Sequence, residues 1–214
     1  MSFIRAASSD KTPWSLVVLF VTWVIGTSIT MFLLERKDLR LFYENQQGVE
    51  VFFEGGKFST ELAQYIEEQQ LQQQGSIYIF HFWNPNCICD QANSEHVKQI
   101  ISNYAVNIIF FLVANANDYS AYLEQWKDVI PYGRIKFISY EELQLTTDLP
   151  ATPAAAVVSP SGKLNYFGPY SEGGVCLPND EGIIEGILDS ILIGESKYYP
   201  FTTGYGCYCP WQKE

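Results

Sequence analysis

The chain has 214 residues, of which 47% are hydrophobic and 17% are charged. This composition is typical of a protein that folds around a buried core, and the length fits a membrane anchor plus one domain better than two domains. The formal net charge is -11, so the chain would repel phosphate backbones and anionic lipid surfaces. The composition excludes a disordered protein and argues against a nucleic-acid partner.

An uncharged segment runs from Trp14 to Leu34 after a short N-terminal tail, 1–13. Its length matches the ~20 residues that a helix needs to cross the hydrocarbon core of a membrane. It is longer than the apolar part of a secretory signal and no Ala-x-Ala site follows it, so a retained transmembrane helix is predicted. Basic residues flank both ends, so charge alone does not decide the orientation. Paired cysteines favour an oxidising compartment, which in a bacterium predicts an inner-membrane protein with its domain in the periplasm.

The rest of the chain divides into a connector, 35–57, a domain, 58–194, and a cysteine-containing tail, 195–214. Apolar periodicity predicts a βαβ unit followed by a ββα unit, with helices covering a mixed sheet. In chain order the expected elements are a short strand at 49–53, a helix from a cap at Ser59 or Thr60 to Gln73, a strand at 77–83, a helix around 92–101, a strand at 107–113, a helix at 119–129, strands at 135–138, 154–158 and 164–167, and a helix at 181–192.

Two cysteines, Cys87 and Cys89, come where a predicted strand ends and a predicted helix begins. Unpaired N–H groups and the positive end of the helix dipole stabilise a thiolate there, which lowers the pKa of a thiol from its free value of about 8.5. Because only the thiolate attacks disulfides, the position predicts reactive sulfur atoms. Buried structural cysteines are the alternative interpretation.

The segment Phe82-Trp83, followed by three residues and then Cys87, resembles the entry to the active site of membrane-anchored bacterial thioredoxin-like proteins. Those proteins usually carry Cys-x-x-Cys, whereas here the second thiol comes one residue early and Asp90 stands where the resolving cysteine would be. The chain therefore resembles a Cys-x-Cys variant of the periplasmic thioredoxin-like family. A disulfide between Cys87 and Cys89 would close a small, strained ring and would be easy to reduce.

A second point of resemblance is Ala151-Thr152-Pro153, directly before a predicted strand. In that family the corresponding proline is cis, lies beside the active-site thiols and presents backbone to an extended substrate. The resemblance covers roughly 59–192 and implies a thioredoxin-like three-layer α/β sandwich. The site residues that it implies are Cys87 and Cys89 for catalysis, and Trp83, Thr152 and Pro153 for substrate binding.

Asp90 has two interpretations, because it would either tune the thiols or supply a favourable charge at the start of the helix. Of the two histidines, His81 is expected to pack within a strand or lie at the surface, and His96 is expected to face solvent.

Three further cysteines are candidates for a resolving or relay role. Cys176 follows a Gly-Gly pair in the loop after the last predicted strand. In the family fold this loop lies at the same end of the sheet as the active-site thiols, so Cys176 would either resolve a mixed disulfide or remain an unpaired loop thiol. Cys207 and Cys209 lie in a tail too rich in aromatic residues, Gly and Pro to form a helix. The tail is long enough to reach the active-site end. The tail would act either as a thiol relay or as a clasp held by a structural disulfide, for which Cys176 is one candidate partner.

These features predict a membrane-tethered thiol–disulfide oxidoreductase that acts on extracytoplasmic protein thiols or disulfides and needs no cofactor. One alternative is a copper-binding metallochaperone, because paired thiolates suit Cu(I). No positioned histidine is identified for it, so no metal site is predicted. The other alternative is a redox-inert binding module, whose thiols would resist mild alkylation.

Overall fold

The computed structural model describes residues 14–37, 39–43, 49–53, 55–71, 75–132, 135–170, 182–195 and 204–211. Contacts divide the chain into two compact units, Met1–Asp38 and Leu39–Glu214. Each unit is described by itself.

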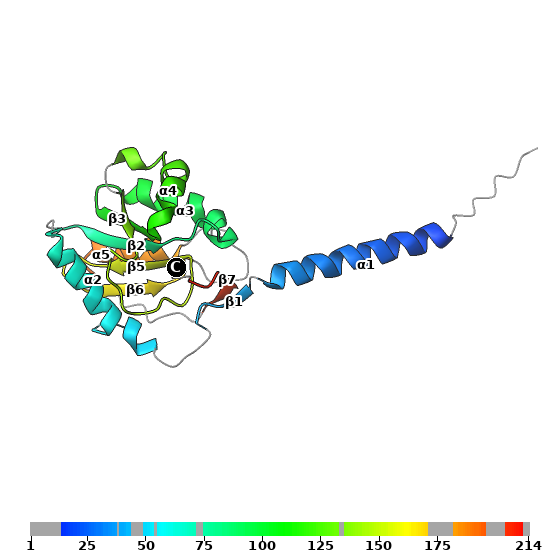
Figure 1. The fold of residues 1–214 in the computed structure, drawn as a ribbon, viewed down its shortest axis with the longest axis horizontal. Helices are drawn as coiled ribbons and strands as arrows, with labels where there is room; N and C mark the ends of the chain where they lie inside the picture. Colours follow the sequence, from blue (N-terminus) through cyan, green and yellow to red (C-terminus); the bar gives the residue numbers. More distant parts are fainter. Residues whose placement is uncertain are drawn as a thin grey trace, which may run out of the picture. The chain divides into compact units, whose positions relative to one another are not determined.

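The first unit contains the long helix α1 (Trp14–Lys37), drawn in blue in Figure 1. Its segment Trp14–Leu33 is long and apolar enough to cross a membrane, a test that a signal sequence near the N-terminus also passes. The side chains of this segment are all exposed. The hydroxyls of Thr22 and Thr30 donate to carbonyls of the preceding turn at 2.8 Å. Both hydroxyls therefore have a hydrogen-bond partner within the helix, which a polar group in apolar surroundings needs.

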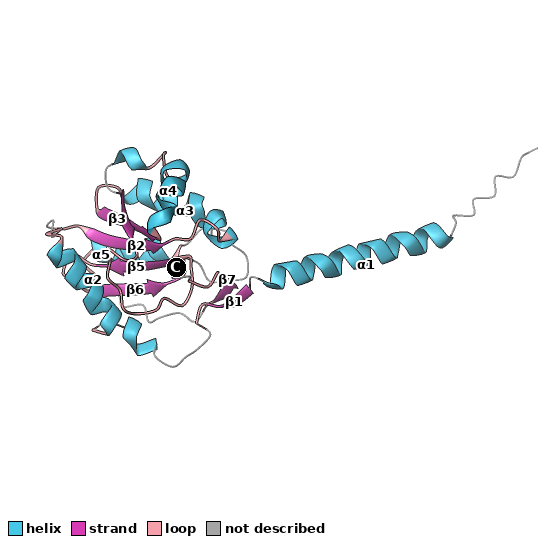
Figure 2. Ribbon diagram, in the orientation of Figure 1, coloured by secondary structure: helices cyan, strands magenta, loops and turns pink. Residues whose placement is uncertain are grey.

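The second unit is built on a mixed sheet with the strand order β4-β3-β2-β5-β6. The first three strands are parallel to one another, and β5 and β6 are antiparallel to their neighbours. Helices cover both faces of the sheet (Figure 2), so the chain has the predicted thioredoxin-like α/β fold. The strands are β2 (Ile77–Phe82), β3 (Ile108–Ala114), β4 (Ile135–Ser139), β5 (Ala154–Val158) and β6 (Leu164–Gly168), and the helices are α2 (Lys57–Glu68), α3 (Ile88–Tyr104), α4 (Tyr119–Gln125) and α5 (Ile183–Leu192).

The core consists of two apolar layers, one on each face of the sheet. Every residue of β2 is buried, which explains why its sequence is almost continuously apolar. Alternate side chains of β2 point to opposite faces, so that Phe80 packs with α2 and Ile79 packs with α3 and α5. The carboxyl end of this central strand leads directly into the turn that carries Cys87.

Two predictions about the connector and the first helix are wrong. The segment around 49–53 forms a 3-10 helix, Val49–Phe52, instead of a strand, because Phe52 turns onto the sheet and stacks on Phe167 of β6 with ring centroids 4.7 Å apart. Helix α2 begins at Lys57 with Gly56 as its N-cap, and not after Ser59 or Thr60. Two short 3-10 helices, Ala116–Asp118 and Ile130–Tyr132, flank α4.

A small second sheet joins the two ends of this unit. Strand β1 (Leu39–Leu41) pairs antiparallel with β7 (Tyr205–Cys207), and Leu39 lies opposite Cys207. The two strands lie side by side in Figure 1. Next to them the Phe42 N–H donates to the Gly204 carbonyl at 2.9 Å. This pairing, which the sequence analysis did not predict, fixes the position of the cysteine-containing tail.

Candidate active site

Cys87 occupies the start of α3, as predicted. It is the N-cap residue of that helix, with φ -87° and ψ 119°. Its N–H donates to the Asn84 carbonyl at 3.0 Å, and its own carbonyl accepts from the Gln91 N–H at 3.1 Å. Asn84 also holds the turn through its side chain, which accepts from the Asn86 N–H at 2.9 Å. The sulfur therefore lies where the first N–H groups of a 17-residue helix lack intrahelical partners.

The Thr152–Pro153 peptide bond is cis, which confirms the cis-proline that the family resemblance implied. The Cys87 Sγ lies 3.9 Å from the Thr152 carbonyl oxygen, so residues 65 positions apart in sequence meet at one place. Trp83, directly after β2, is only 1% exposed, and its ring lies 6.2 Å from that of Trp126. Its role in substrate binding stays a prediction, as do those of Thr152 and Pro153.

Both helix-start cysteines form disulfides with the tail. Cys87 is bonded to Cys209, with an S–S distance of 2.07 Å, and Cys89 is bonded to Cys207, with an S–S distance of 2.04 Å. Cys87 and Cys89 are therefore not bonded to each other, contrary to what the family resemblance suggested. Cys176, considered above as a partner of the tail, lies outside the described residues.

The tail lies against the cis-proline segment as an extended strand would. The Thr152 N–H donates to the Cys209 carbonyl at 2.9 Å, and the Cys209 N–H donates to the Thr152 carbonyl at 2.8 Å. Tyr208 packs edge-on against Phe42, with centroids 5.3 Å apart. Trp211 packs between Phe82 and Tyr140, at 6.1 and 5.3 Å. The tail thus occupies the position that the family resemblance assigns to an extended substrate.

Asp90 is buried beneath the site, with 1% exposure. Its Oδ2 accepts from the Asn84 N–H at 3.1 Å and contacts the Thr152 hydroxyl, which also lies 2.9 Å from the Phe82 carbonyl. The Thr152 hydroxyl has one hydrogen for two acceptors. Both contacts are satisfied if Asp90 is protonated and donates to Thr152. Burial raises the pKa of Asp90 well above its usual value, although the hydrogen bonds with Thr152 and Asn84 act to lower it. Burial therefore favours the neutral form of the Asp90 carboxyl over a charge at the helix start.

His81 lies next to this acid and is also buried. Its Nδ1 is 2.9 Å from the Tyr170 hydroxyl, and its Nε2 is 3.9 Å from the Asp90 Oδ1. Burial lowers the pKa of His81 to about 3, against the opposing effect of a hydrogen bond with the Ala154 backbone. The lowered pKa of His81 and the raised pKa of Asp90 both act against an ion pair between these two side chains.

The prediction that His96 faces solvent is wrong. The side chain is 6% exposed, and its Nε2 lies 2.6 Å from the Glu185 Oε1. This contact joins α3 to α5. A partner on a helix 89 positions away leaves no signal in the local sequence around His96.

Replacing Asp90 with Asn is expected to flatten the dependence of stability on pH above pH 6.5. The folded carboxyl keeps a proton that the unfolded chain loses above pH 3.8, so the free energy of unfolding falls by about 1.4 kcal/mol per pH unit while that proton stays bound. His81 acts in the opposite direction between about pH 3 and 6.5, so the effect of Asp90 is unopposed above pH 6.5. Urea unfolding at a series of pH values from 6.5 upward measures it. Equal slopes for wild type and Asp90→Asn would contradict the neutral state of Asp90.

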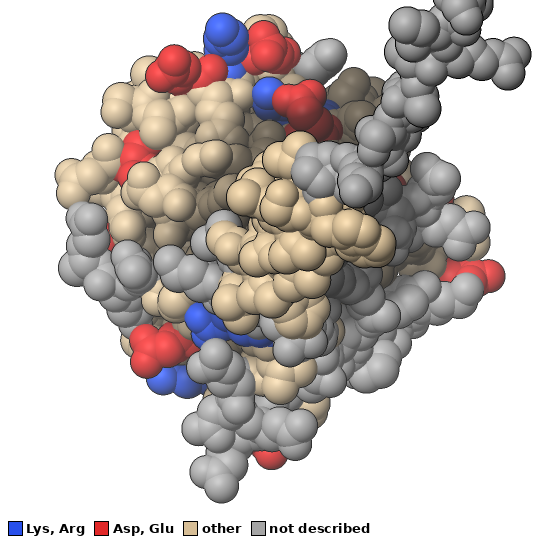
Figure 3. All heavy atoms as spheres, turned by 90° about the vertical axis from the view of Figure 1, so that its right-hand side faces the viewer, with Lys and Arg blue, Asp and Glu red and all other residues tan. Residues whose placement is uncertain are grey.

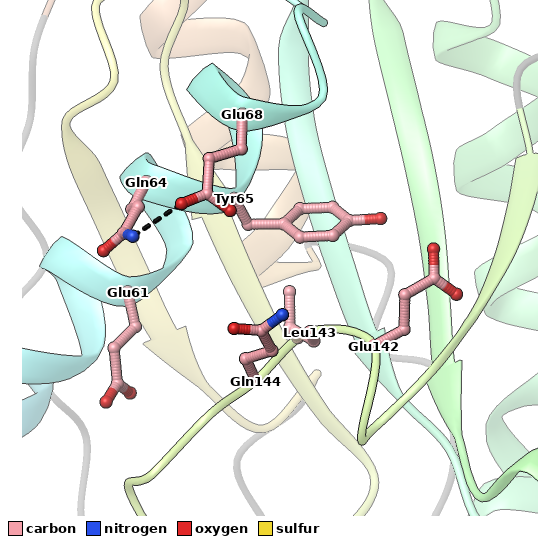
Figure 4. A pocket seen from close by; sticks show the side chains of 7 residues that line it. All are labelled: Glu61, Gln64, Tyr65, Glu68, Glu142, Leu143 and Gln144. Carbon is pink, nitrogen blue, oxygen red and sulfur yellow. Dashed lines mark hydrogen bonds between the residues drawn. The ribbon is translucent and has the colours of Figure 1, made fainter.

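Three of the sulfur atoms, those of Cys87, Cys89 and Cys209, lie within 4.8 Å of one another. Thiolates this close would suit a soft ion such as Cu(I) after reduction. A separate cavity of about 60 Å³, shown in Figure 4, lies between α2 and the turn after β4. The side chains that line it are Glu61, Gln64, Tyr65, Glu68, Glu142, Leu143 and Gln144. None of these is a cysteine, so the cavity is separate from the sulfur cluster.

Charged side chains of both signs stand next to one another on the face shown in Figure 3. Among the coloured residues of this face, Lys and Arg therefore do not form an extended basic patch, in agreement with the net charge of -11.

Several solved structures are similar to this chain at low sequence identity. A hypothetical protein from Sinorhizobium meliloti 1021 is 14% identical, with a TM-score of 0.49 over 66% of this chain and 82% of that one. A putative thioredoxin from Neisseria meningitidis is 16% identical, with a TM-score of 0.42 over 57% and 79%. A secreted Mycobacterium tuberculosis disulfide oxidoreductase homologous to E. coli DsbE is 16% identical, with a TM-score of 0.39 over 56% and 83%.

A comparison with curated proteins gave no match. Residues 57–211 match a family model described as "Domain of unknown function (DUF6436)". This match includes the Cys-x-Cys turn, the cis-proline segment and both tail cysteines. Because it covers well over half of the chain, the protein belongs to the DUF6436 family.

Proposed function

We propose that the protein is a membrane-tethered thiol–disulfide oxidoreductase that exchanges disulfides with extracytoplasmic proteins through Cys87 and Cys89. One observation carries the proposal: Cys87 lies at the start of α3, 3.9 Å from the Thr152 carbonyl, and forms a disulfide with Cys209. The helix start favours the thiolate, and the disulfide is the oxidised form of an exchanging pair of thiols.

The oxidised protein can accept a fixed number of electrons from its substrates. Each disulfide accepts two electrons when two substrate thiols become one disulfide, and the two protons released by the substrate end on the protein cysteines. With Cys87–Cys209 and Cys89–Cys207 both formed, one chain converts two dithiols into two disulfides and itself becomes a tetrathiol. Repeated turnover needs an oxidised disulfide compound, such as glutathione disulfide, to restore the protein.

The proposed location follows from the anchor and the disulfides together. The segment Trp14–Leu33 fits a membrane span, and disulfides persist in oxidising compartments such as the bacterial periplasm. We place α1 in the inner membrane and the domain from Leu39 onward on the periplasmic side. Its partners are then proteins with thiols or disulfides in that compartment.

Binding of a soft metal ion is the second candidate function, and the spacing of three sulfurs within 4.8 Å favours it. It ranks below the redox function because each of these sulfurs is in a disulfide, and only a thiolate is a strong ligand. A Cu(I) titration of the reduced protein that loses its stoichiometry in Cys87→Ala would favour metal binding.

The redox proposal is tested by mixing the oxidised full chain, in detergent micelles, with an excess of a reduced peptide that contains two cysteines. About two peptide disulfides per protein chain are expected, because two disulfides are available for exchange. Acid quenching followed by mass spectrometry counts them. A yield indistinguishable from that of peptide alone would refute the proposed function.

A further inference from the structure

The two sides of each disulfide differ in their exposure. Cys87 and Cys89 are 1% and 0% exposed, whereas Cys207 and Cys209 are both partly exposed. An attacking thiolate must reach one sulfur of a disulfide along the S–S axis, so access decides which sulfur is attacked. In this structure access favours the sulfurs of the tail.

The stability of the thiolate that is expelled also favours attack on the tail sulfur. Attack at the Cys209 sulfur expels the Cys87 thiolate, which forms at the N-cap of α3. A thiol with a lowered pKa leaves faster, and the start of a helix lowers the pKa of a thiol. Attack at the Cys87 sulfur would instead expel the thiolate of Cys209, which lies in an extended segment outside any helix.

Contacts other than the Cys87–Cys209 bond also hold the tail in place. Cys209 is paired with Thr152 through two backbone hydrogen bonds of 2.8 and 2.9 Å. Trp211 packs against Phe82 and Tyr140, and the Cys89–Cys207 disulfide links the tail to α3. A mixed disulfide on Cys209 would therefore be held next to the Cys87 sulfur.

We infer that Cys209 is the sulfur through which outside thiols enter the site, so that the tail is a built-in relay to the buried pair. This inference rests on the proposed function. In the first step an outside thiolate RS⁻ bonds to the Cys209 sulfur, the Cys87–Cys209 bond breaks, and Cys87 leaves as the thiolate. In the second step another RS⁻ attacks the R sulfur of the mixed disulfide, which releases RSSR and the Cys209 thiolate. Two electrons and two protons from 2 RSH thus end on Cys87 and Cys209.

The test determines which cysteine carries the outside thiol. The full-length double variant Cys89→Ser/Cys207→Ser keeps only the Cys87–Cys209 disulfide of the two seen here. It is treated briefly with reduced glutathione in detergent, quenched with acid, denatured and alkylated with N-ethylmaleimide. Peptide mass spectrometry is expected to find glutathione on Cys209 and the maleimide on Cys87, in at least about tenfold excess over the reverse arrangement.

The companion variant Cys87→Ser/Cys209→Ser is the matched control, because it keeps only Cys89–Cys207. Glutathione is expected on the tail residue Cys207 here as well, because Cys89 is completely buried. Glutathione on Cys87, an even distribution between Cys87 and Cys209, or no adduct on either residue would overturn the relay. If the wild-type chain still oxidises the dithiol peptide in that case, only the relay fails. If wild type does not oxidise the peptide, the proposed function itself fails.

Discussion

Cys87→Ser is expected to lower the number of peptide disulfides formed per chain from about two to about one, because a hydroxyl neither forms a disulfide nor ionises near neutral pH. The substitution removes the Cys87–Cys209 bond and leaves Cys89–Cys207 as the remaining crossed disulfide, which is still available for exchange. The number of peptide disulfides formed per full-length chain, counted with no oxidant added, measures the effect.

Ser94→Ala is the matched control for this experiment. Ser94 is exposed on the same helix, and its hydroxyl donates only to the Gln91 carbonyl of the preceding turn, at 2.7 Å. The control is expected to form about two peptide disulfides per chain, like the wild type, since exposed substitutions away from a site have small effects. A Cys87→Ser protein that folds and still forms as many peptide disulfides as the control would contradict a catalytic role for Cys87.

Loss of both tail disulfides is expected to cost about 7 kcal/mol of unfolding free energy, whereas loss of either one alone costs only about 2 kcal/mol. The first crosslink closes a loop between residues 122 or 118 positions apart, which corresponds to about 5 kcal/mol of loop-closure entropy. The second then closes a ring of roughly six residues, 87–89 and 207–209, which corresponds to about 2 kcal/mol. Each disulfide therefore makes the other partly redundant.

Urea denaturation in mild detergent, followed by tryptophan fluorescence, measures this non-additivity. The variants are Cys87→Ser/Cys209→Ser, Cys89→Ser/Cys207→Ser and the combination of all four substitutions. A quadruple variant within about 1 kcal/mol of wild type would show that the tail is not crosslinked to the helix start. Two large and additive losses would show that the disulfides do not share one loop.

The central part of the fold could be predicted because its signals are local. An aromatic and β-branched run gives β2, and turn-forming residues at 160–162 separate β5 from β6, which pair as a hairpin. The position of Cys87 followed from the same signals, since a strand and a helix meet there. The cis peptide bond before Pro153 followed from the family resemblance.

Features that depend on contacts between distant residues could not be predicted from the sequence. Strand β1 has three residues and pairs with another three-residue strand near the end of the chain, so neither shows a periodic pattern. Five cysteines allow many pairings, and spacing does not select one. The burial of Asp90 arises from the cis-proline segment above it, which contributes Thr152 from 62 positions away. In isolation, an Asp in a first helical turn predicts only a favourable surface charge.

Mapping the disulfides tests the crossed arrangement most directly. The full-length protein is isolated from cells under acid quench, free thiols are alkylated, and the protein is digested without reduction for mass spectrometry. The crossed arrangement predicts peptides that join Cys87 to Cys209 and Cys89 to Cys207. Peptides that join Cys87 to Cys89 and Cys207 to Cys209, or a tail crosslinked only to Cys176, would contradict it.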